Sequence, residues 1–297
     1  MSSGPLPTFL GLGAPKAATT WLFRCLQEHP NVFVADVKET EFFSWGHTIR
    51  DLDDYRGHFA NVDGERAVGE ITTSYLYWEG TPDRVYDAIP DAQLFVSLRN
   101  PMDQVYSHYW HLRRQNFHQD ENPRPESFEA ALEMYPEKLL RPALYAEHLG
   151  RWLERFDRRQ LHILFYEDIQ NNPEQVIDEL YSFLEVDPSV RPSALRSNGT
   201  SVRRGTSPQS PMYERIYTTL YDGLTQYVYH PVKQWIGPSR AERIKNTLRV
   251  RETLESIFRK EGYPDMAPDT RARLRDHFAD DIAKLEDLTD RDLSHWM

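Results

Sequence analysis

Four short apolar runs that alternate with helical patterns constrain the fold of this chain more than any other feature. The apolar runs cover residues 8–12, 67–70, 93–98 and 161–165. Helical patterns follow the first and third runs, and further ones cover residues 81–89, 142–156 and 173–184. Strands and helices that alternate in this way pack as a parallel sheet covered by helices. We therefore predict an α/β fold, a three-layer sandwich with a central parallel sheet flanked by helices.

The later part of the chain departs from this alternation. Residues 186–212 carry four prolines and a polar run, which predicts a long loop. From residue 213 onward the pattern is helical, and it ends with a helix over residues 270–285 and a closing segment that runs to Trp296. We predict one domain over residues 1–297, with residues 213–297 as a helical extension packed on it.

Composition narrows the function. A net charge of −11 argues against nucleic acid or an anionic membrane surface as partner, so an anionic ligand must meet a local basic pocket. We find neither the roughly 20 apolar residues that cross a bilayer nor a secretory signal, and expect a cytoplasmic enzyme. The single cysteine, Cys25, shares a helix face with Leu22 and Leu26, which predicts a buried thiol.

The loop after the first apolar run has the features of a phosphate-binding turn. A helix that begins near Ala17 leaves its first backbone N–H groups free to bind an anion. Ala17 and Ala18 are small enough for close approach, Thr19 and Thr20 add hydroxyl donors, and Lys16 adds a positive charge. The segment lacks the second glycine and the Lys-Ser/Thr pair of a Walker A loop. The alternative interpretation is an ordinary turn with a surface lysine.

This segment resembles a known family. The sequence GLGAPKAATTWLFRCLQEHP is similar to the 5′-phosphosulfate loop, PKxGTTxL, of sulfotransferases that use 3′-phosphoadenosine-5′-phosphosulfate (PAPS). The resemblance implies a P-loop-like fold and a co-substrate site that runs from Lys16 through Ala17, Ala18, Thr19 and Thr20 to Trp21. Ala18 stands where the family usually has glycine. We expect the alanine to be tolerated, because a helical position does not require a positive φ.

A second match follows the third apolar run. Residues 98–109 resemble the family's 3′-phosphate signature, which implies that Arg99 and Ser107 hold that phosphate. An arginine offers a planar fork of donors, and the carboxyl ends of parallel strands form the ligand crevice of such sheets. The alternative is that Arg99 supports a structural network and Ser107 is solvated. An arginine here also argues against a kinase, which tends to place a magnesium-binding aspartate at such a position.

A third basic element lies within the predicted loop. Residues 197–205 resemble the late loop that closes over the nucleotide in this family, which implies that Arg203 and Arg204 bind it. Closure of such a loop would exclude water from the activated sulfate. A surface loop without this role is the alternative.

The resemblance also supplies a catalytic base. Residues 37–43 are similar to the K-E-x-x-F-F segment of heparan-sulfate-type and bacterial sulfotransferases, which implies that Glu39 accepts the acceptor's proton. Lys16 would stabilise the leaving phosphate. His47 and His111 are reserve candidates for the base. Whether Lys38 contacts the sulfate or only its glutamate neighbours stays open.

The acceptor is less well defined. Residues 68–75 resemble the family's G-E-K-x-x-x-Y segment, but Ile71 replaces the lysine that heparan-type enzymes bring to the sulfate, which weighs against a heparan-like acceptor. The acceptor can be a small molecule, a lipid or a saccharide with a hydroxyl or an amine. Aromatic residues that could line its pocket, or belong to the core, are Trp45, Tyr75, Tyr77, Trp78 and Trp110.

We therefore predict a sulfotransferase that uses PAPS, releases 3′-phosphoadenosine 5′-phosphate (PAP) and needs no metal. A nucleoside kinase and a PAPS-binding protein without turnover are the alternatives. The oligomeric state stays open.

Overall fold

The computed structural model describes residues 4–44, 51–114, 125–196, 206–208 and 259–297. The chain forms two compact units, one of residues 1–203 with 266–297 and one of residues 204–265. The described part of the second unit is an antiparallel pair, β6 (Thr206–Pro208) and β7 (Arg259–Glu261). The predicted loop over residues 186–212 is wrong in part, because it contains β6 and the short helix α10 (Ser193–Arg196). The one-domain organisation stays a prediction.

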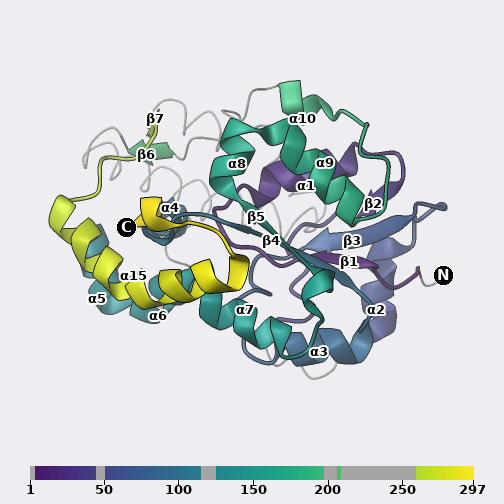
Figure 1. Cartoon of the computed structure of the whole chain (residues 1–297), viewed down its shortest axis with the longest axis horizontal. Coiled ribbons are helices and arrows are strands. Elements are labelled where there is room, and N and C mark those ends of the chain that lie inside the picture. Colours follow the sequence, from purple (N-terminus) through teal and green to yellow (C-terminus); the bar gives the residue numbers. More distant parts are fainter. Residues whose placement is uncertain (1–3, 45–50, 115–124, 197–205, 209–258) are drawn as a thin grey trace, which may run out of the picture. The chain divides into compact units, whose positions relative to one another are not determined.

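The first unit is built on a five-stranded sheet in which every neighbouring pair is parallel (Figure 1). The strand order is β2-β3-β1-β4-β5. The strands are β1 (Phe9–Gly11), β2 (Val32–Val34), β3 (Ala67–Ile71), β4 (Gln93–Leu98) and β5 (Leu161–Phe165). The predicted parallel α/β sheet is confirmed. The sequence reading missed β2, because three residues between turn formers are too few to show a periodic pattern.

Strand β1 occupies the centre of the sheet and determines where a ligand can bind. Phe9 lies in register with Gly69 of β3 on one side and with Gln93 of β4 on the other. The connection after β1 leads to β2 on one side of the sheet and the connection after β4 leads to β5 on the other, so the loops at the carboxyl ends of β1 and β4 diverge, which is where open α/β sheets bind ligands. The segments after β1, β3 and β4 therefore meet at one edge of the sheet.

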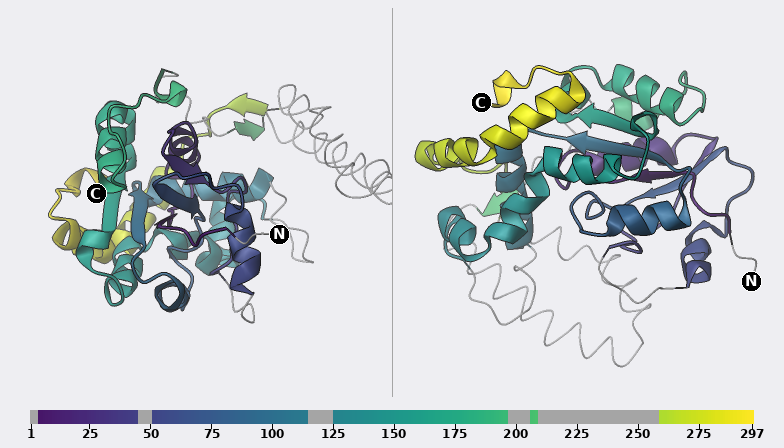
Figure 2. Two further views of the ribbon diagram at one scale, coloured as in Figure 1. Left: turned by 90° about the vertical axis from the view of Figure 1, so that its right-hand side faces the viewer. Right: turned by 60° about the horizontal axis from the view of Figure 1, so that its bottom comes forward.

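Helices cover both faces of the sheet (Figures 1 and 2). In Figure 1, α1, α8 and α9 lie on one side and α3 and α7 on the other, as a three-layer sandwich requires. The helices of this unit, besides α10 and single turns, are α1 (Thr19–Gln27), α2 (Leu52–Arg56), α3 (Thr81–Ala88), α4 (Pro101–Arg114), α5 (Phe128–Met134), α6 (Pro136–Leu140), α7 (Tyr145–Leu153), α8 (Tyr166–Asn171), α9 (Pro173–Phe183) and α15 (Pro268–Thr289). The helix predicted over residues 142–156 is shorter, because a 3-10 turn over Arg141–Ala143 precedes α7.

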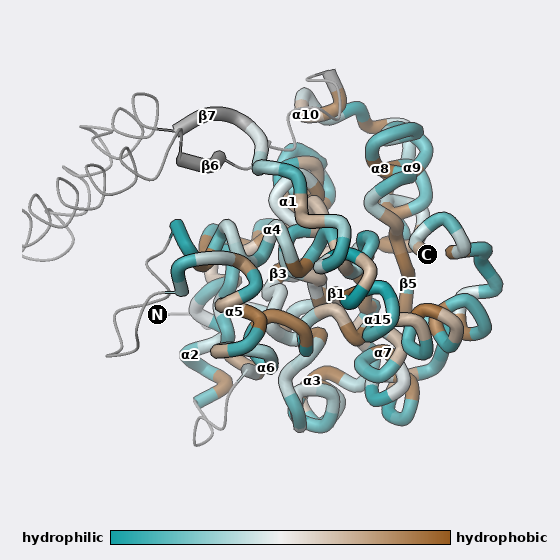
Figure 3. The backbone as a smooth tube through the Cα atoms, turned by 90° about the vertical axis from the view of Figure 1, so that its left-hand side faces the viewer, coloured by the Kyte–Doolittle hydropathy of each residue, from teal (hydrophilic) through white to brown (hydrophobic). Residues whose placement is uncertain are grey.

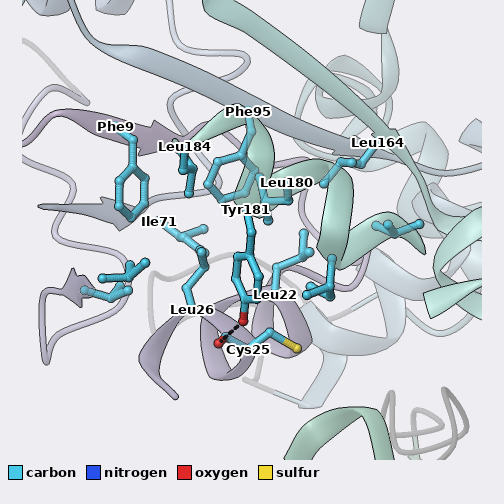
Figure 4. Close-up of a cluster of buried hydrophobic side chains, with 14 of the residues drawn as sticks. Phe9, Leu22, Cys25, Leu26, Ile71, Phe95, Leu164, Leu180, Tyr181 and Leu184 are labelled. Atoms are coloured by element: carbon cyan, nitrogen blue, oxygen red, sulfur yellow. Dashed lines mark hydrogen bonds between the residues drawn. The ribbon is translucent and has the colours of Figure 1, made fainter. Parts of the chain in front are cut away.

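A hydrophobic cluster joins α1 and α9 to one face of the sheet (Figure 4). Tyr181 of α9 crosses this cluster, and its hydroxyl donates to the Cys25 carbonyl oxygen at 2.7 Å. Cys25 is fully buried, so the prediction of a buried thiol is confirmed. Ile71 is also fully buried in this cluster, whereas the preceding Glu70 points to the opposite face, as alternation along a strand requires.

Helix α15 packs against α7 and α4 through one apolar stripe. Figure 3 shows that α15 carries both hydrophilic and hydrophobic residues, whereas β5 is mostly hydrophobic. Asp281 is buried in this interface, and its carboxylate accepts hydrogen bonds from the Ala146 and Glu147 backbone N–H groups, both at 3.1 Å. These bonds satisfy donors at the first turn of α7. None of the helices in the described ranges has the length and apolar content to cross a membrane.

Candidate active site

The loop between β1 and α1 is fixed by side chains of β4 and α4. Ser97 donates from its hydroxyl to the Ala17 carbonyl oxygen at 2.6 Å. Gln104 donates from its amide to the Pro15 carbonyl oxygen at 3.2 Å. Because both donors come from buried side chains, the loop is held in one conformation before any ligand arrives.

The free N–H groups of this loop lie one residue later than predicted. Helix α1 begins at Thr19 rather than near Ala17, and the Ala17 N–H donates to the Ala14 carbonyl oxygen at 3.3 Å. Within the described residues, the backbone N–H groups of Ala18, Thr19 and Thr20 have no protein acceptor. Three adjacent donors at the start of a helix make an anion site.

Ala18 is not helical, so the expectation that its position needs no positive φ is wrong. As the N-cap of α1 it has φ 64° and ψ 14°, in the left-handed region, and Lys16 has φ 67°. An L-residue in this region costs about 1–2 kcal/mol, whereas glycine occupies it freely. The family's glycine therefore suits the local backbone, and Ala18 is tolerated under strain.

Four cations gather around this loop. Burial, followed by the positive charges of Arg114, Arg99 and Lys38, lowers the pKa of Lys16 to about 8. Arg114 was not predicted as a site residue. The signal that could have indicated it is its place two turns after Ser107 on the polar stripe of α4.

Arg99 follows β4 directly and borders the phosphate loop. Its guanidinium donates to the Lys16 carbonyl oxygen at 3.4 Å and stacks over the Tyr166 ring, 4.5 Å from the centroid. Ser107 lies further along α4 and is 6% exposed. Both residues belong to the elements expected from the sequence. Their contact with a 3′-phosphate stays a prediction.

Glu39 is brought to the loop through its neighbour Lys38. One Glu39 carboxylate oxygen accepts from the Thr73 backbone N–H at 2.7 Å and from the Thr73 hydroxyl at 3.0 Å. The other accepts from the Lys38 ammonium at 2.6 Å, which also donates to the Thr19 hydroxyl oxygen at 3.3 Å. Lys38 therefore contacts both its glutamate neighbour and the phosphate loop. The segment after β2 thus reaches the start of α1.

A buried glutamate lies beneath this segment and was not predicted as a site residue. Glu70 is fully buried, and its carboxylate accepts hydrogen bonds from the hydroxyls of Thr72 at 2.6 Å, Tyr75 at 2.7 Å, Thr40 at 2.8 Å and Tyr55 at 3.1 Å. Burial raises the pKa of Glu70, and these four bonds oppose that rise. Thr40 follows the predicted base and Thr72 precedes its partner Thr73, so this network supports the base. The signal in the sequence is a carboxylate within an apolar strand.

The expected aromatic residues divide between the core and the site edge. Tyr75 is fully buried on Glu70, and Trp110 is buried on α4. Tyr77 and Trp78 are half-buried. Burial, followed by the negative charges of Glu39 and Glu41, raises the pKa of Tyr77 to about 12.

The remaining predicted residues differ in their outcome. The Trp21 indole N–H donates to the Ala194 carbonyl oxygen at 3.3 Å within the core, and its role toward a nucleotide stays a prediction. His111 is half-buried on α4. Arg203, Arg204, His47 and Trp45 lie outside the described residues.

Comparison with known proteins defines the class. The sulfotransferase domain family matches residues 7–200, more than half of the chain. A solved sulfotransferase from Alicyclobacillus acidocaldarius superposes with a TM-score of 0.69 at 28% identity, covering 98% of this chain and 99% of that one. The chain belongs to the sulfotransferase domain family. The predicted P-loop-like sandwich and the enzyme class are thereby confirmed.

Two relatives of this chain are enzymes named for heparan sulfate. The human bifunctional heparan sulfate N-deacetylase/N-sulfotransferase 3 is 30% identical over 201 residues, 62% of this chain and 23% of that protein. The Drosophila melanogaster bifunctional enzyme is 29% identical over 214 residues, 62% of this chain and 20% of its own length. The chain thus spans about a fifth of the length of these relatives.

Proposed function

We propose that this chain transfers the sulfuryl group of PAPS to an acceptor, with Glu39 as base and Lys16 at the leaving phosphate. One observation carries the proposal. The Lys38 ammonium donates to Glu39 at 2.6 Å and to Thr19 of the phosphate loop at 3.3 Å. Only the Lys38 side chain therefore links the proposed base to the anion site. This spacing suits in-line attack on a sulfur atom that lies between Glu39 and the leaving phosphate.

The transfer proceeds by a balanced exchange of bonds. A Glu39 carboxylate oxygen takes the acceptor's proton while the acceptor oxygen or nitrogen forms a bond to sulfur. The bond from sulfur to the bridging oxygen of the 5′-phosphate breaks, and its electron pair stays on PAP. Lys16 offsets the charge that develops on that oxygen. When Lys38 turns from Glu39 to the anion, it uncovers one oxygen of the base.

The nucleotide is held by backbone and side-chain donors. The free N–H groups of residues 18–20 and the Thr19 and Thr20 hydroxyls face the 5′-phosphosulfate. We propose that Arg99 and Ser107 hold the 3′-phosphate and that Arg203 and Arg204 also bind the nucleotide. These roles follow the family motifs at matching positions.

The acceptor binds beside Glu39 and Tyr77. A small molecule, a lipid or a saccharide with a free hydroxyl or amine fits this chemistry. Ile71 is fully buried in the core cluster, so this position does not supply the ammonium group that the lysine of heparan-type enzymes brings to the sulfate. An acceptor that differs from heparan sulfate is favoured for this reason.

Three further expectations stay predictions. A cytoplasmic location is tested by cell fractionation of the native protein. Metal independence is tested by transfer in the presence of a chelator, where we expect no loss. The oligomeric state is open to sedimentation analysis.

The first experiment is a calorimetric titration with PAP, with adenosine 5′-monophosphate (AMP) and with ATP plus magnesium. We expect PAP to bind tightly and the other two nucleotides to bind weakly. The tight binding of PAP should be lost in Arg99→Ala. Preferential binding of ATP with magnesium would overturn the proposal in favour of a nucleoside kinase. Transfer reactions with radiolabelled PAPS and a panel of phenol, amino sugar and lipid acceptors then follow. Labelled product identifies the acceptor class, whereas PAP binding without any labelled product indicates a binding protein without turnover.

A further inference from the structure

The closing segment, residues 290–297, is anchored by one tryptophan. Trp296 is 1% exposed, and its ring lies 5.9 Å from the Phe165 ring and 6.4 Å from the Tyr145 ring. The indole N–H donates to the Glu167 carboxylate at 3.1 Å. Arg291 adds a paired hydrogen bond to Asp168 at 2.5 and 2.8 Å. The segment is therefore fixed to the residues that follow β5.

The same tryptophan is hydrogen-bonded to Asn100, the residue that follows Arg99. The Trp296 carbonyl oxygen accepts a hydrogen bond from the Asn100 side-chain amide at 3.4 Å. The Asn100 side-chain oxygen in turn accepts from the Met102 N–H at 3.0 Å and caps the first turn of α4. Asn100 is thus held on two sides, by the closing segment and by the helix that carries Ser107.

A second connection between Trp296 and Arg99 runs through Tyr166. The Arg99 guanidinium lies over the Tyr166 ring, 4.5 Å from its centroid, and Tyr166 stands between Phe165 and Glu167, both of which Trp296 contacts. Two routes, one through Asn100 and one through Tyr166, therefore connect Trp296 to Arg99.

We propose that the closing segment is a positioning element for Arg99 and sets the affinity for the 3′-phosphate of the nucleotide. This inference rests on the proposed function. Trp296 is a positioning residue, because it reaches the ligand only through Arg99 and Asn100. A free arginine side chain loses much rotamer entropy on binding, so a guanidinium held in place before binding gains affinity.

The test compares PAP with AMP, which lacks the 3′-phosphate. We measure both dissociation constants by calorimetry for the full chain and for Trp296→Ala, at a temperature where circular dichroism shows each to be folded. We expect Trp296→Ala to weaken PAP by about tenfold, within the range of coupled sites, and to leave AMP within about twofold. A uniform loss of both affinities indicates a structural role only and overturns the inference.

Milder and matched variants keep the test decisive. Asn100→Ala and Trp296→Phe should reduce the same PAP preference by smaller factors, and they replace Trp296→Ala if that variant does not fold. Trp152→Phe is the control, because Trp152 is also fully buried and donates to the Leu76 carbonyl oxygen at 3.4 Å. We expect Trp152→Phe to keep the PAP preference.

Arg99→Ala separates the two hypotheses. If the wild-type chain does not prefer PAP over AMP, the proposed function fails. If Arg99→Ala abolishes that preference while Trp296→Ala and Asn100→Ala retain it, only the inference about the closing segment fails.

Discussion

The two sides of the candidate active site are held in place by different means. On the nucleotide side, carbonyl oxygens of the phosphate loop are tied by Ser97 and Gln104, and the backbone itself supplies the donors. On the base side, Glu39 is held by side chains, and the buried Glu70 network lies beneath it.

This difference separates recognition from chemistry. A site made of backbone N–H groups changes little when single side chains are replaced. A base that depends on a side-chain network loses its orientation when one member is removed. We therefore expect substitutions on the base side to reduce turnover while the nucleotide still binds.

The largest effect is expected for Glu39→Gln. The amide cannot accept the proton, so transfer should fall by about 10²–10⁴-fold, the usual contribution of a general base. PAP affinity, measured by calorimetry, should stay unchanged. Glu41→Gln is the matched control, an exposed glutamate two residues away that should keep its activity. Loss of PAP binding in Glu39→Gln would show that the two sides are not separate.

Glu70→Gln should have the next largest effect. A buried amide cannot accept all four hydroxyl donors, so we expect a loss of about 1–3 kcal/mol in the free energy of unfolding, measured with urea. Transfer should fall with unchanged PAP affinity, because the change displaces Glu39. Tyr55→Phe removes one bond only and should cost less. Equal stability of Glu70→Gln and wild type would contradict the network.

The nucleotide side should respond to pH through Lys16, whose pKa is lowered to about 8. The bound anion favours the protonated lysine, so PAP affinity should fall as pH rises through 8, by up to about tenfold per pH unit. Calorimetry in buffers of different ionisation enthalpy should detect proton uptake on binding near pH 8. If Lys16→Met still takes up a proton when PAP binds, another group is the one that is protonated.

The unfolded chain keeps this lysine proton up to its ordinary pKa, so the effect on stability has the opposite sign. Between about pH 8 and the ordinary lysine value, the Lys16 contribution to the free energy of unfolding increases with pH. Urea unfolding of wild type and Lys16→Met across this range measures that contribution by difference.

Ala18→Gly should have the smallest effect. Relief of the left-handed strain favours the variant by about 1–2 kcal/mol, and the greater freedom of glycine in the unfolded chain offsets about 0.4–1 kcal/mol of this. The melting temperature should therefore rise slightly. Ala17→Gly is the control and should lower it. A clear loss of stability in Ala18→Gly would exclude the left-handed conformation.

On the nucleotide side, the place of each predicted residue in the fold could be predicted from the sequence, because these residues follow strands with clear apolar patterns. Lys16 to Thr20 form one linear motif, and Arg99 ends a strand that its apolar pattern reveals. The left-handed conformation of Ala18 could not be predicted, because a two-residue error in the helix start changes the backbone region it occupies.

Contacts between distant residues explain most of what was missed. Thr40 and Glu70 are 30 residues apart, and Asn100 and Trp296 are 196 residues apart. No local pattern encodes such pairs, since periodicity reports only which face of an element is buried. Arg114 was missed because a charge at the end of a helix is usually solvated.

The cations around the phosphate loop have a consequence for handling the purified protein. Lys16, Arg99, Arg114 and Lys38 repel one another when no anion lies between them. The empty chain carries this repulsion as a cost to folding, and any small anion that occupies the loop relieves it. Resistance to heat therefore depends on the buffer, and sulfate or phosphate should protect the enzyme better than chloride at the same ionic strength.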